Sequence, residues 1–237
     1  MTVVGSYDRN IDKVAKRASE NVVDLGKPMS LTGLFLCLFL VVHLMGNFQL
    51  LKDDEGEAFN KYTYFMTHNP LIKFISYSLY TFILLHTIQG LILVYENRKS
   101  RISNYNTKHA SKTTFGSRHM GLLGTMILFF LVGHMGDFWF KMKQGVLETV
   151  NYVDYEAMQN LYSRVSMAYD QWWIVLLYVI SMVVLAFHLE HGFQSAFQTL
   201  GFNHPRYTPI IKGIGRLFCI LIPLGFAIIP IYHFLFK

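Results

Sequence analysis

Charged residues are scarce in this chain of 237 residues. Asp, Glu, Lys and Arg make up 15% of it, against about 25% in a soluble globular domain, and the mean hydropathy is +0.31. This composition argues against a water-soluble enzyme, a disordered tail and a nucleic-acid-binding protein. The net charge of +6 does not change that conclusion, because the basic residues sit in short segments between apolar runs, which is a membrane pattern.

Cysteine is equally rare. The two cysteines, Cys37 and Cys219, both lie inside apolar stretches. They exclude a disulfide framework, an iron–sulfur site with its usual set of about four thiolates, and the C-x-x-C-H motif of covalently attached haem. No internal repeat or low-complexity tract divides the sequence. We therefore expect a single membrane domain over residues 1–237.

Hydrophobic residues, which form 52% of the chain, gather in five segments that are each long enough to cross a membrane. We place these segments at about 29–51, 71–95, 118–141, 172–199 and 210–235. Their Leu, Phe, Ile, Val and Met content favours helices, and no alternating pattern points to a barrel. The predicted fold class is an all-α integral membrane protein with five transmembrane helices, preceded by a polar surface segment over residues 1–28.

Lysine and arginine predict the orientation of this bundle. With the N-terminus inside, the inner segments hold 14 of the 21 basic residues and the outer segments hold 7. The positive-inside rule therefore places residues 1–28 in the cytoplasm and the C-terminus outside. Three tryptophans fall at predicted outer boundaries, as in an aromatic belt: Trp139, Trp172 and Trp173. The connection at 142–171 is expected to lie along the outer surface.

Four of the five apolar segments carry a histidine near their middle. These are His43, His86, His134 and His188. Because the helices alternate in direction, His43 and His134 fall in the outer half of the membrane, and His86 and His188 fall about 10 Å deeper, in the inner half. Two histidines at each of two levels are what two stacked bis-imidazole haems need. A lone intramembrane histidine is more often a core residue or a proton relay, but four in this arrangement favour ligands.

Other polar residues near the spans are weaker candidates for a site. His191 follows His188 by three residues, and Arg118 and His119 lie at an inner boundary, so these three are candidates for haem propionate or second-shell contacts. Asp137 follows His134 by three residues toward the outer surface and could exchange protons there. His233, near the outer end of the fifth segment, is expected to be interfacial.

The motifs around these residues resemble the cytochrome b membrane anchor of succinate dehydrogenases and fumarate reductases, in the single-chain class with five helices and two haems. The resemblance lies in V-V-H-L-M-G-N around His43, L-H-T-I-Q-G around His86 and F-H-L-E-H-G-F around His188. It extends to E-A-F-N-K and F-M-T-H-N-P in the first outer connection. These motifs are individually short, but they occur in one order and spacing over most of the chain.

The resemblance implies that His43 and His134 bind the outer haem b and that His86 and His188 bind the inner one. It further implies a subunit of succinate:quinone oxidoreductase in the bacterial cytoplasmic membrane, without a dehydrogenase site of its own. The partners would be an iron–sulfur subunit, a flavoprotein subunit, membrane lipid and a quinone, usually menaquinone. The N-terminal segment and the basic connection at 96–118 would face the iron–sulfur subunit. Asn47, His68 and Asp137 are candidates for the quinone site because they lie on the outer side.

Two alternatives stay open. The first is a di-haem anchor of another membrane dehydrogenase, such as a hydrogenase, formate dehydrogenase or nitrate reductase. The fifth segment has no central histidine, which disfavours anchors that take a ligand from it. The second is a proton-coupled transporter that uses the buried histidines as a relay. Transporters often break a helix at midplane, and Pro223 is the one feature that points that way.

Overall fold

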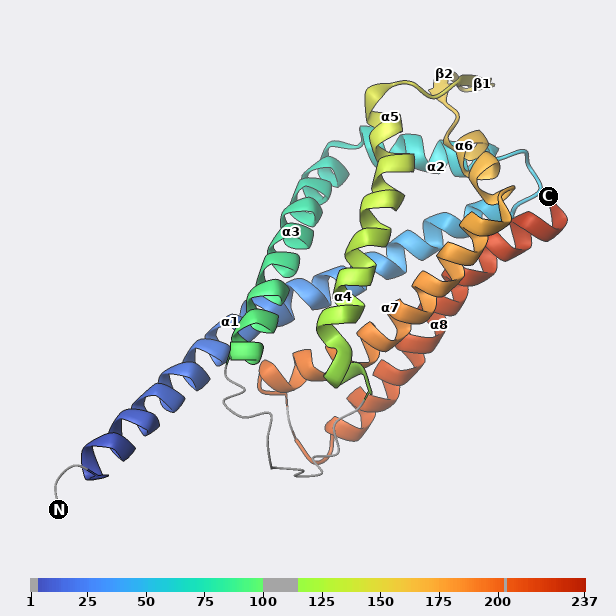
Figure 1. Cartoon of the computed structure of the whole chain (residues 1–237). Coiled ribbons are helices and arrows are strands. Elements are labelled where there is room, and N and C mark those ends of the chain that lie inside the picture. Colours follow the sequence, from blue (N-terminus) through green and yellow to red (C-terminus); the bar gives the residue numbers. More distant parts are fainter. Residues whose placement is uncertain (1–3, 100–114, 203) are drawn as a thin grey trace.

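The computed structural model describes residues 4–99, 115–202 and 204–237 (Figure 1). Its five long helices are α1 (Val4–Asn47), α3 (Pro70–Lys99), α4 (Phe115–His134), α7 (Trp172–Thr199) and α8 (Thr208–Phe236). Five segments are long and apolar enough to cross a membrane, at 26–51, 70–99, 118–144, 172–199 and 208–236. Each of their ends lies within four residues of the predicted one. The prediction of a mainly helical chain with five possible membrane spans is confirmed.

The predicted surface segment 1–28 is not a separate element. From Val4 onward it is helical and continuous with the first span, so that α1 has 44 residues; residues 1–3 lie outside the described part of the chain. At 1.5 Å per residue α1 is about 66 Å long, roughly twice the hydrocarbon thickness of a bilayer. Its N-terminal part accordingly projects beyond the other helices (Figure 1).

Four of the long helices pack in a ring. α1 contacts α3 and α7, and α4 contacts the same two helices, while α8 lies against α7 and α1. Going round the ring, α1 is therefore opposite α4, and α3 is opposite α7. The outward faces carry exposed apolar side chains, among them Phe74, Phe129 and Leu217. Such an apolar exterior is suited to lipid.

The short elements gather at one end of the bundle, which we call the capped end (Figure 1). They are η1 (Phe48–Leu51), α2 (Glu57–His68), α5 (Lys141–Gln144), β1 (Thr149–Tyr152), β2 (Tyr155–Gln159) and α6 (Leu161–Tyr169). β1 and β2 form an antiparallel hairpin. The connection predicted at 142–171 thus supplies most of this cap, and the C-terminus of α8 lies at the same end. We call the opposite end of the bundle, where α1 begins, the N-terminal end.

One buried asparagine ties the cap together. Asn60 on α2 has no exposed surface. Its amide nitrogen donates to the Tyr152 hydroxyl and to Oδ1 of Asn160, both at 2.9 Å, and its oxygen accepts from the backbone N–H of Tyr162 at 3.0 Å. A buried apolar cluster surrounds this end of the bundle and includes Leu44, Leu50, Phe59, Phe138, Leu161, Val165 and Ile229. The cap is therefore a packed layer joined to the helices.

The fourth helical span changes its winding just after its central histidine. α4 ends at His134, and the next six residues form the π-helix η2 (Met135–Phe140), which leads into α5. A π-turn accommodates one extra residue and is often found at functional sites. It sets the direction of the side chains that follow His134, including Asp137.

Candidate functional site

Each helix of the ring carries one of the four histidines singled out in the sequence, and their rings meet across the two diagonals. The ring centroids of His43 on α1 and His134 on α4 are 5.8 Å apart, with an interplanar angle of 87°. Those of His86 on α3 and His188 on α7 are 6.4 Å apart, at 72°. All four side chains are half-buried. The structure thus brings together the two pairs that helix direction had placed at equal depths.

The two pairs lie at different distances from the capped end. Counted along the spanning segments, His43 is 8 residues (51 − 43) and His134 is 10 residues (144 − 134) from that end, whereas His86 (86 − 70) and His188 (188 − 172) are both 16 residues from it. A difference of 6 to 8 residues corresponds to about 9–12 Å along a helix. We call His43 and His134 the cap-side pair, and His86 and His188 the N-side pair.

A threonine on α1 fixes one imidazole of the N-side pair. The Thr32 side chain is buried, and its Oγ1 lies 3.2 Å from Nδ1 of His86. The Thr32 hydroxyl donates its only proton to a backbone carbonyl of its own helix, that of Pro28 or Met29, both at 3.0 Å. When its proton is on one of these carbonyls, the hydroxyl accepts from Nδ1–H of His86, and that tautomer leaves the lone pair of Nε2 for a metal.

A tyrosine on α7 plays the equivalent part in the cap-side pair. The Tyr178 hydroxyl is 3.1 Å from Nδ1 of His134. Phe130 and Tyr169 meet the Tyr178 ring edge-on, at centroid distances of 5.0 and 5.4 Å. Phe130 also stacks on His134 at 5.6 Å. In each pair, then, a hydroxyl from a neighbouring helix of the ring contacts the far nitrogen of one imidazole.

The geometry of both pairs fits an iron that brings its own equatorial ligands. With metal–nitrogen bonds of about 2 Å, and a nitrogen about 1.2 Å from its ring centre, two imidazoles on one iron would have centroids roughly 6 Å apart. The observed spacings are 5.8 and 6.4 Å. A bare metal ion would want three or more protein ligands, and no such group of His, Cys, Asp and Glu occurs among the described residues. Two imidazoles suit a haem.

His188, the other imidazole of the N-side pair, has no hydroxyl partner like that of His86 within the described ranges of the chain. Nδ1 of His188 is buried and has no hydrogen-bond partner among the described residues. A Cβ added to Gly33 would lie 3.2 Å from Cε1 of His86, and one added to Gly124 would lie 3.6 Å from Cε1 of His188. A side chain at position 33 would therefore make His86 shift by a few tenths of an ångström, whereas a Cβ at position 124 would only be in van der Waals contact with His188.

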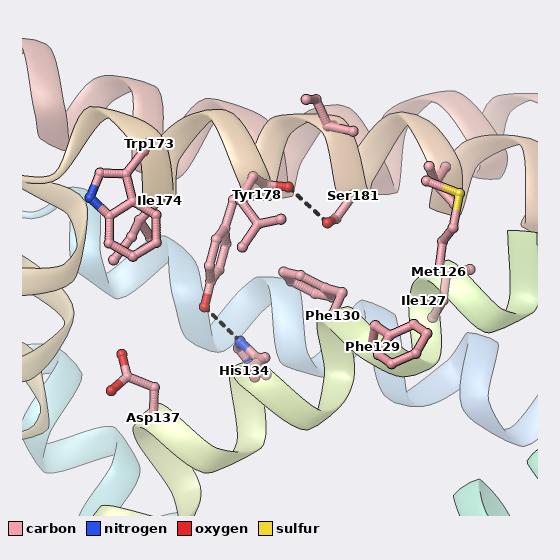
Figure 2. A pocket seen from close by; sticks show the side chains of 14 residues that line it. Met126, Ile127, Phe129, Phe130, His134, Asp137, Trp173, Ile174, Tyr178 and Ser181 are labelled. Carbon is pink, nitrogen blue, oxygen red and sulfur yellow. Dashed lines mark hydrogen bonds between the residues drawn. The ribbon is translucent and has the colours of Figure 1, made fainter.

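A cavity opens beside the cap-side pair, between α4, η2 and α7 (Figure 2). Its volume is about 460 Å³, within the range of small-molecule sites. The lining is mostly apolar: Met126, Ile127, Phe129, Phe130, Gly133, His134, Asp137, Trp173, Ile174, Leu177, Tyr178, Ile180, Ser181 and Val184. Phe129, Trp173 and Leu177 are at least half exposed on the apolar exterior. The cavity is thus bordered by the surface that would face lipid.

Asp137 is the only acidic residue in that lining, and two cations neutralise it. Its Oδ1 accepts from Lys141 Nζ at 2.7 Å, from Nε of Arg164 at 3.1 Å and from a terminal guanidinium nitrogen of Arg164. Arg164 comes from α6, so this ion pair also holds the cap against the fourth span. The cluster carries one net positive charge at the capped end of the cavity.

The three candidate quinone residues do not come together. Asp137 lines the cavity beside His134. Asn47 donates to the backbone carbonyl of His43 in its own helix at 2.7 Å. His68 is exposed, stacks on Tyr64 at 3.8 Å, and lines a separate cavity of about 320 Å³. Asp137 thus lies beside a histidine of the cap-side pair, whereas Asn47 and His68 make other contacts.

The candidate propionate residues lie toward the N-terminal end. Arg118 and His119 are exposed in the first part of α4. Nδ1 of His119 contacts the Phe115 carbonyl of the same helix at 3.0 Å. His191 is half-buried on α7, and a Cβ at Gly116 would lie 3.3 Å from its Cβ. His191 therefore faces the start of α4 at Gly116, which is two residues before Arg118 in the sequence.

The expectation for His233 was wrong. Its side chain is only 2% exposed, because α6 folds over the end of α8 and places Tyr162 and Tyr169 at ring centroid distances of 6.0 and 5.8 Å. Neither ring nitrogen has a hydrogen-bond partner among the described residues. His233 belongs to the buried layer under the cap.

Sequence reasoning missed Thr32 and Tyr178. Thr32 precedes His43 by eleven residues, which is close to three helical turns, so both lie on one face of α1. That spacing was a usable signal for a polar group at the depth of the N-side pair. Tyr178 had no such signal, since its role depends on α4 and α7 packing together.

In comparisons with known proteins, no family model, curated protein or solved structure matches this chain.

Proposed function

We propose that the chain is the di-haem cytochrome b membrane anchor of a succinate dehydrogenase or fumarate reductase, and that it carries electrons between an iron–sulfur partner subunit and membrane quinone. The observation that carries this proposal is the meeting of four histidines in two pairs, one across each diagonal of the ring and at two depths. Inward-facing side chains of a helix ring are how bundles build cofactor sites.

The proposal gives each of these side chains a task. His43 and His134 would hold one haem b, and His86 and His188 the other. Haem b, when bound, supplies one-electron transfer at its iron. Thr32 keeps His86 in the tautomer that presents Nε2, and a hydrogen bond on the far nitrogen makes an imidazole a more basic ligand. The surrounding apolar helices exclude water from the pairs.

The distribution of charge supports an orientation, and the family resemblance supplies the partners. The capped end would face outside and the N-terminal end the cytoplasm, because that arrangement puts 14 of 21 basic residues inside. The projecting part of α1 and the basic connection at 96–118 would then meet the iron–sulfur subunit, which in turn binds the flavoprotein; residues 100–114 lie outside the described part of the chain. The setting would be the bacterial cytoplasmic membrane.

We place the quinone, with menaquinone as the first candidate, in the cavity beside the cap-side pair. A quinone has an apolar ring and tail and two carbonyl oxygens. The cavity offers apolar walls bordered by the lipid-facing surface, and a few polar groups near His134. The cationic cluster of Asp137, Lys141 and Arg164 would stabilise the negative charge that develops on a quinone oxygen during reduction.

The alternatives are less well supported. A histidine relay in a transporter is usually accompanied by a broken helix at midplane. Despite Pro223 and Pro230, α8 is one helix over Thr208–Phe236. A di-haem anchor of another dehydrogenase shares the histidine pairs, and the identity of the partner subunits would separate it from our proposal.

The test is the haem content of the purified chain, measured by pyridine haemochrome in mild detergent. We expect two haem b per wild-type chain. His134→Ala should lose the cap-side haem and His188→Ala the N-side haem, each leaving one per chain. His68→Ala is the matched control, because His68 is exposed and lies in neither pair; it should retain two.

The same variants test the quinone assignment. In the complete complex, His134→Ala should abolish quinone turnover and spare fumarate reduction with a soluble dye as electron donor. A folded wild-type chain without haem, grown with adequate haem supply, would overturn the proposal and favour the transporter. Two haems with normal quinone turnover in His134→Ala would overturn the assignment of the cap-side pair.

A further inference from the structure

We infer that the Tyr178 hydroxyl is a positioning group that connects the cap-side pair to quinone in the neighbouring cavity. In this arrangement its oxygen accepts a hydrogen bond from Nδ1–H of His134, and its own O–H donates to a quinone carbonyl oxygen. The inference rests on the proposed function, since it assumes a metal at Nε2 of His134 and a quinone in the cavity. Tyr178 would then link His134 to the quinone through a single hydroxyl group.

The acceptor half of this link follows from the chemistry of imidazole. A histidine that binds a metal through Nε2 carries its proton on Nδ1, so Nδ1 is then a donor. The Tyr178 oxygen lies 3.1 Å from Nδ1 of His134, which is within hydrogen-bond distance. Tyr178 must therefore accept in the loaded protein, and the proton of its own hydroxyl has to point elsewhere.

The donor half follows from a comparison with Thr32. The Thr32 hydroxyl, which accepts from His86, donates its proton to a backbone carbonyl of α1. The Tyr178 hydroxyl has no second hydrogen-bond partner in the part of the chain that the structure describes. Tyr178 also lines the cavity, so its donor is available to a molecule bound there. Buried hydroxyl donors normally find a partner.

The other polar side chains of the lining are less suited to donate to a quinone oxygen. Ser181 donates to the Leu177 carbonyl at 2.7 Å. Asp137 is an acceptor already engaged by two cations. The indole nitrogen of Trp173 lies on the side of the ring away from Tyr178 (Figure 2). The Tyr178 hydroxyl is thus the donor closest to the His134 end of the cavity.

The Tyr178 ring is also held in place. Phe130 and Tyr169 contact it edge-on from α4 and α6, and neither contact depends on the hydroxyl. Removing the oxygen alone should therefore leave the ring where it is. Tyr178→Phe is for this reason a clean test of the hydrogen bonds, and Tyr169→Phe is a matched control that removes a neighbouring phenol hydroxyl.

The first readout is the midpoint potential of each haem, from potentiometric titration of the purified chain. A hydrogen bond on Nδ1 makes His134 a stronger electron donor, which favours oxidised iron. Tyr178→Phe should shift the cap-side haem 3- to 10-fold toward its reduced form, a rise of about 30 to 60 mV at 59 mV per tenfold. The N-side haem should keep its potential, and so should both haems of Tyr169→Phe.

The second readout is binding of 2,3-dimethyl-1,4-naphthoquinone, followed by isothermal titration calorimetry on the oxidised protein. Loss of one hydrogen bond should weaken binding about 3- to 10-fold in Tyr178→Phe and leave it unchanged in Tyr169→Phe. Two haems with unchanged cap-side potential or unchanged quinone affinity in Tyr178→Phe would overturn the inference and leave the proposed function standing. A wild-type chain without haem would instead overturn the proposed function.

A second variant covers the case in which Tyr178→Phe does not fold. Replacing Tyr178 by 3,5-difluorotyrosine keeps the hydroxyl and the ring but makes the oxygen a poorer acceptor. The cap-side potential should then rise, as in the phenylalanine variant, while the quinone retains its donor. An unchanged potential in a folded difluorotyrosine protein with two haems would contradict the acceptor half of the link.

Discussion

Replacing Thr32 with valine should weaken haem binding at the N-side pair and spare the cap-side pair. Valine has nearly the shape of threonine, so the buried position stays filled, but Nδ1–H of His86 loses its acceptor. A buried donor left without a partner costs about 1–3 kcal/mol. At 1.4 kcal/mol per factor of ten this is about a 5- to 150-fold loss of affinity. Loss of a hydrogen-bond partner to a ligand histidine typically costs 10- to 100-fold, in the same range.

The assay is a titration of haem-depleted membranes with haem b, followed by the optical spectrum of each haem. Thr125→Val is the matched control. Thr125 lies in the fourth span and donates to the Gly121 carbonyl of its own helix at 2.8 Å, so this variant also loses a hydroxyl within a membrane helix. We expect one weakened and one normal haem in Thr32→Val, and two normal haems in Thr125→Val. Wild-type affinity at both sites in Thr32→Val would refute the reasoning.

Two further predictions concern the cap. Asn60→Ala removes three side-chain hydrogen bonds worth about 0.5–1.5 kcal/mol each, so the free energy of unfolding in mixed micelles should fall by about 1.5–4.5 kcal/mol; a loss below 0.5 kcal/mol would contradict the role of Asn60. Burial raises the pKa of the Tyr169 phenol above its ordinary value of about 10. The neutral phenol therefore contributes fully to the free energy of unfolding below about pH 10, and this contribution is lost as the pH rises through the higher pKa of the folded state. The thermal midpoint of Tyr169→Phe should therefore fall less than that of the wild type between pH 9 and pH 11, and equal slopes would show that Tyr169 does not contribute.

The spans and the depth of each histidine could be predicted because both follow from fixed quantities. A helix rises 1.5 Å per residue and has to cross about 30 Å of hydrocarbon, so position along a span gives depth. His43 and His86 could thus be assigned to different levels before any packing was known. The order of the helices round the ring could not, because nothing in the sequence states that α1 lies opposite α4. The roles of the histidines as haem ligands stay a prediction.

The cap shows why the remaining contacts of the fold could not be predicted from the sequence. Asn60 lies in the E-A-F-N-K motif of the first outer connection, but the motif gives it no structural role, and its partners Tyr152 and Asn160 lie 92 and 100 residues away. His233 reads as interfacial from its place near the end of a span, and α6 buries it by tertiary packing. In both cases the deciding contact is between segments that are distant in the chain.

The π-helix after His134 changes the direction in which the side chains of the fourth span point. Each residue of an α-helix turns the side chains by about 100°, so one extra residue rotates everything beyond it by about that angle relative to everything before it. Asp137, within η2, lines the cavity beside His134 and also meets Arg164 of the cap. Deleting a single residue from Met135–Phe140 should restore α-helical winding and rotate the side chains beyond the deletion by about 100°, away from their present contacts with the cap. The length of this short stretch is as much a part of the site as the identity of its side chains.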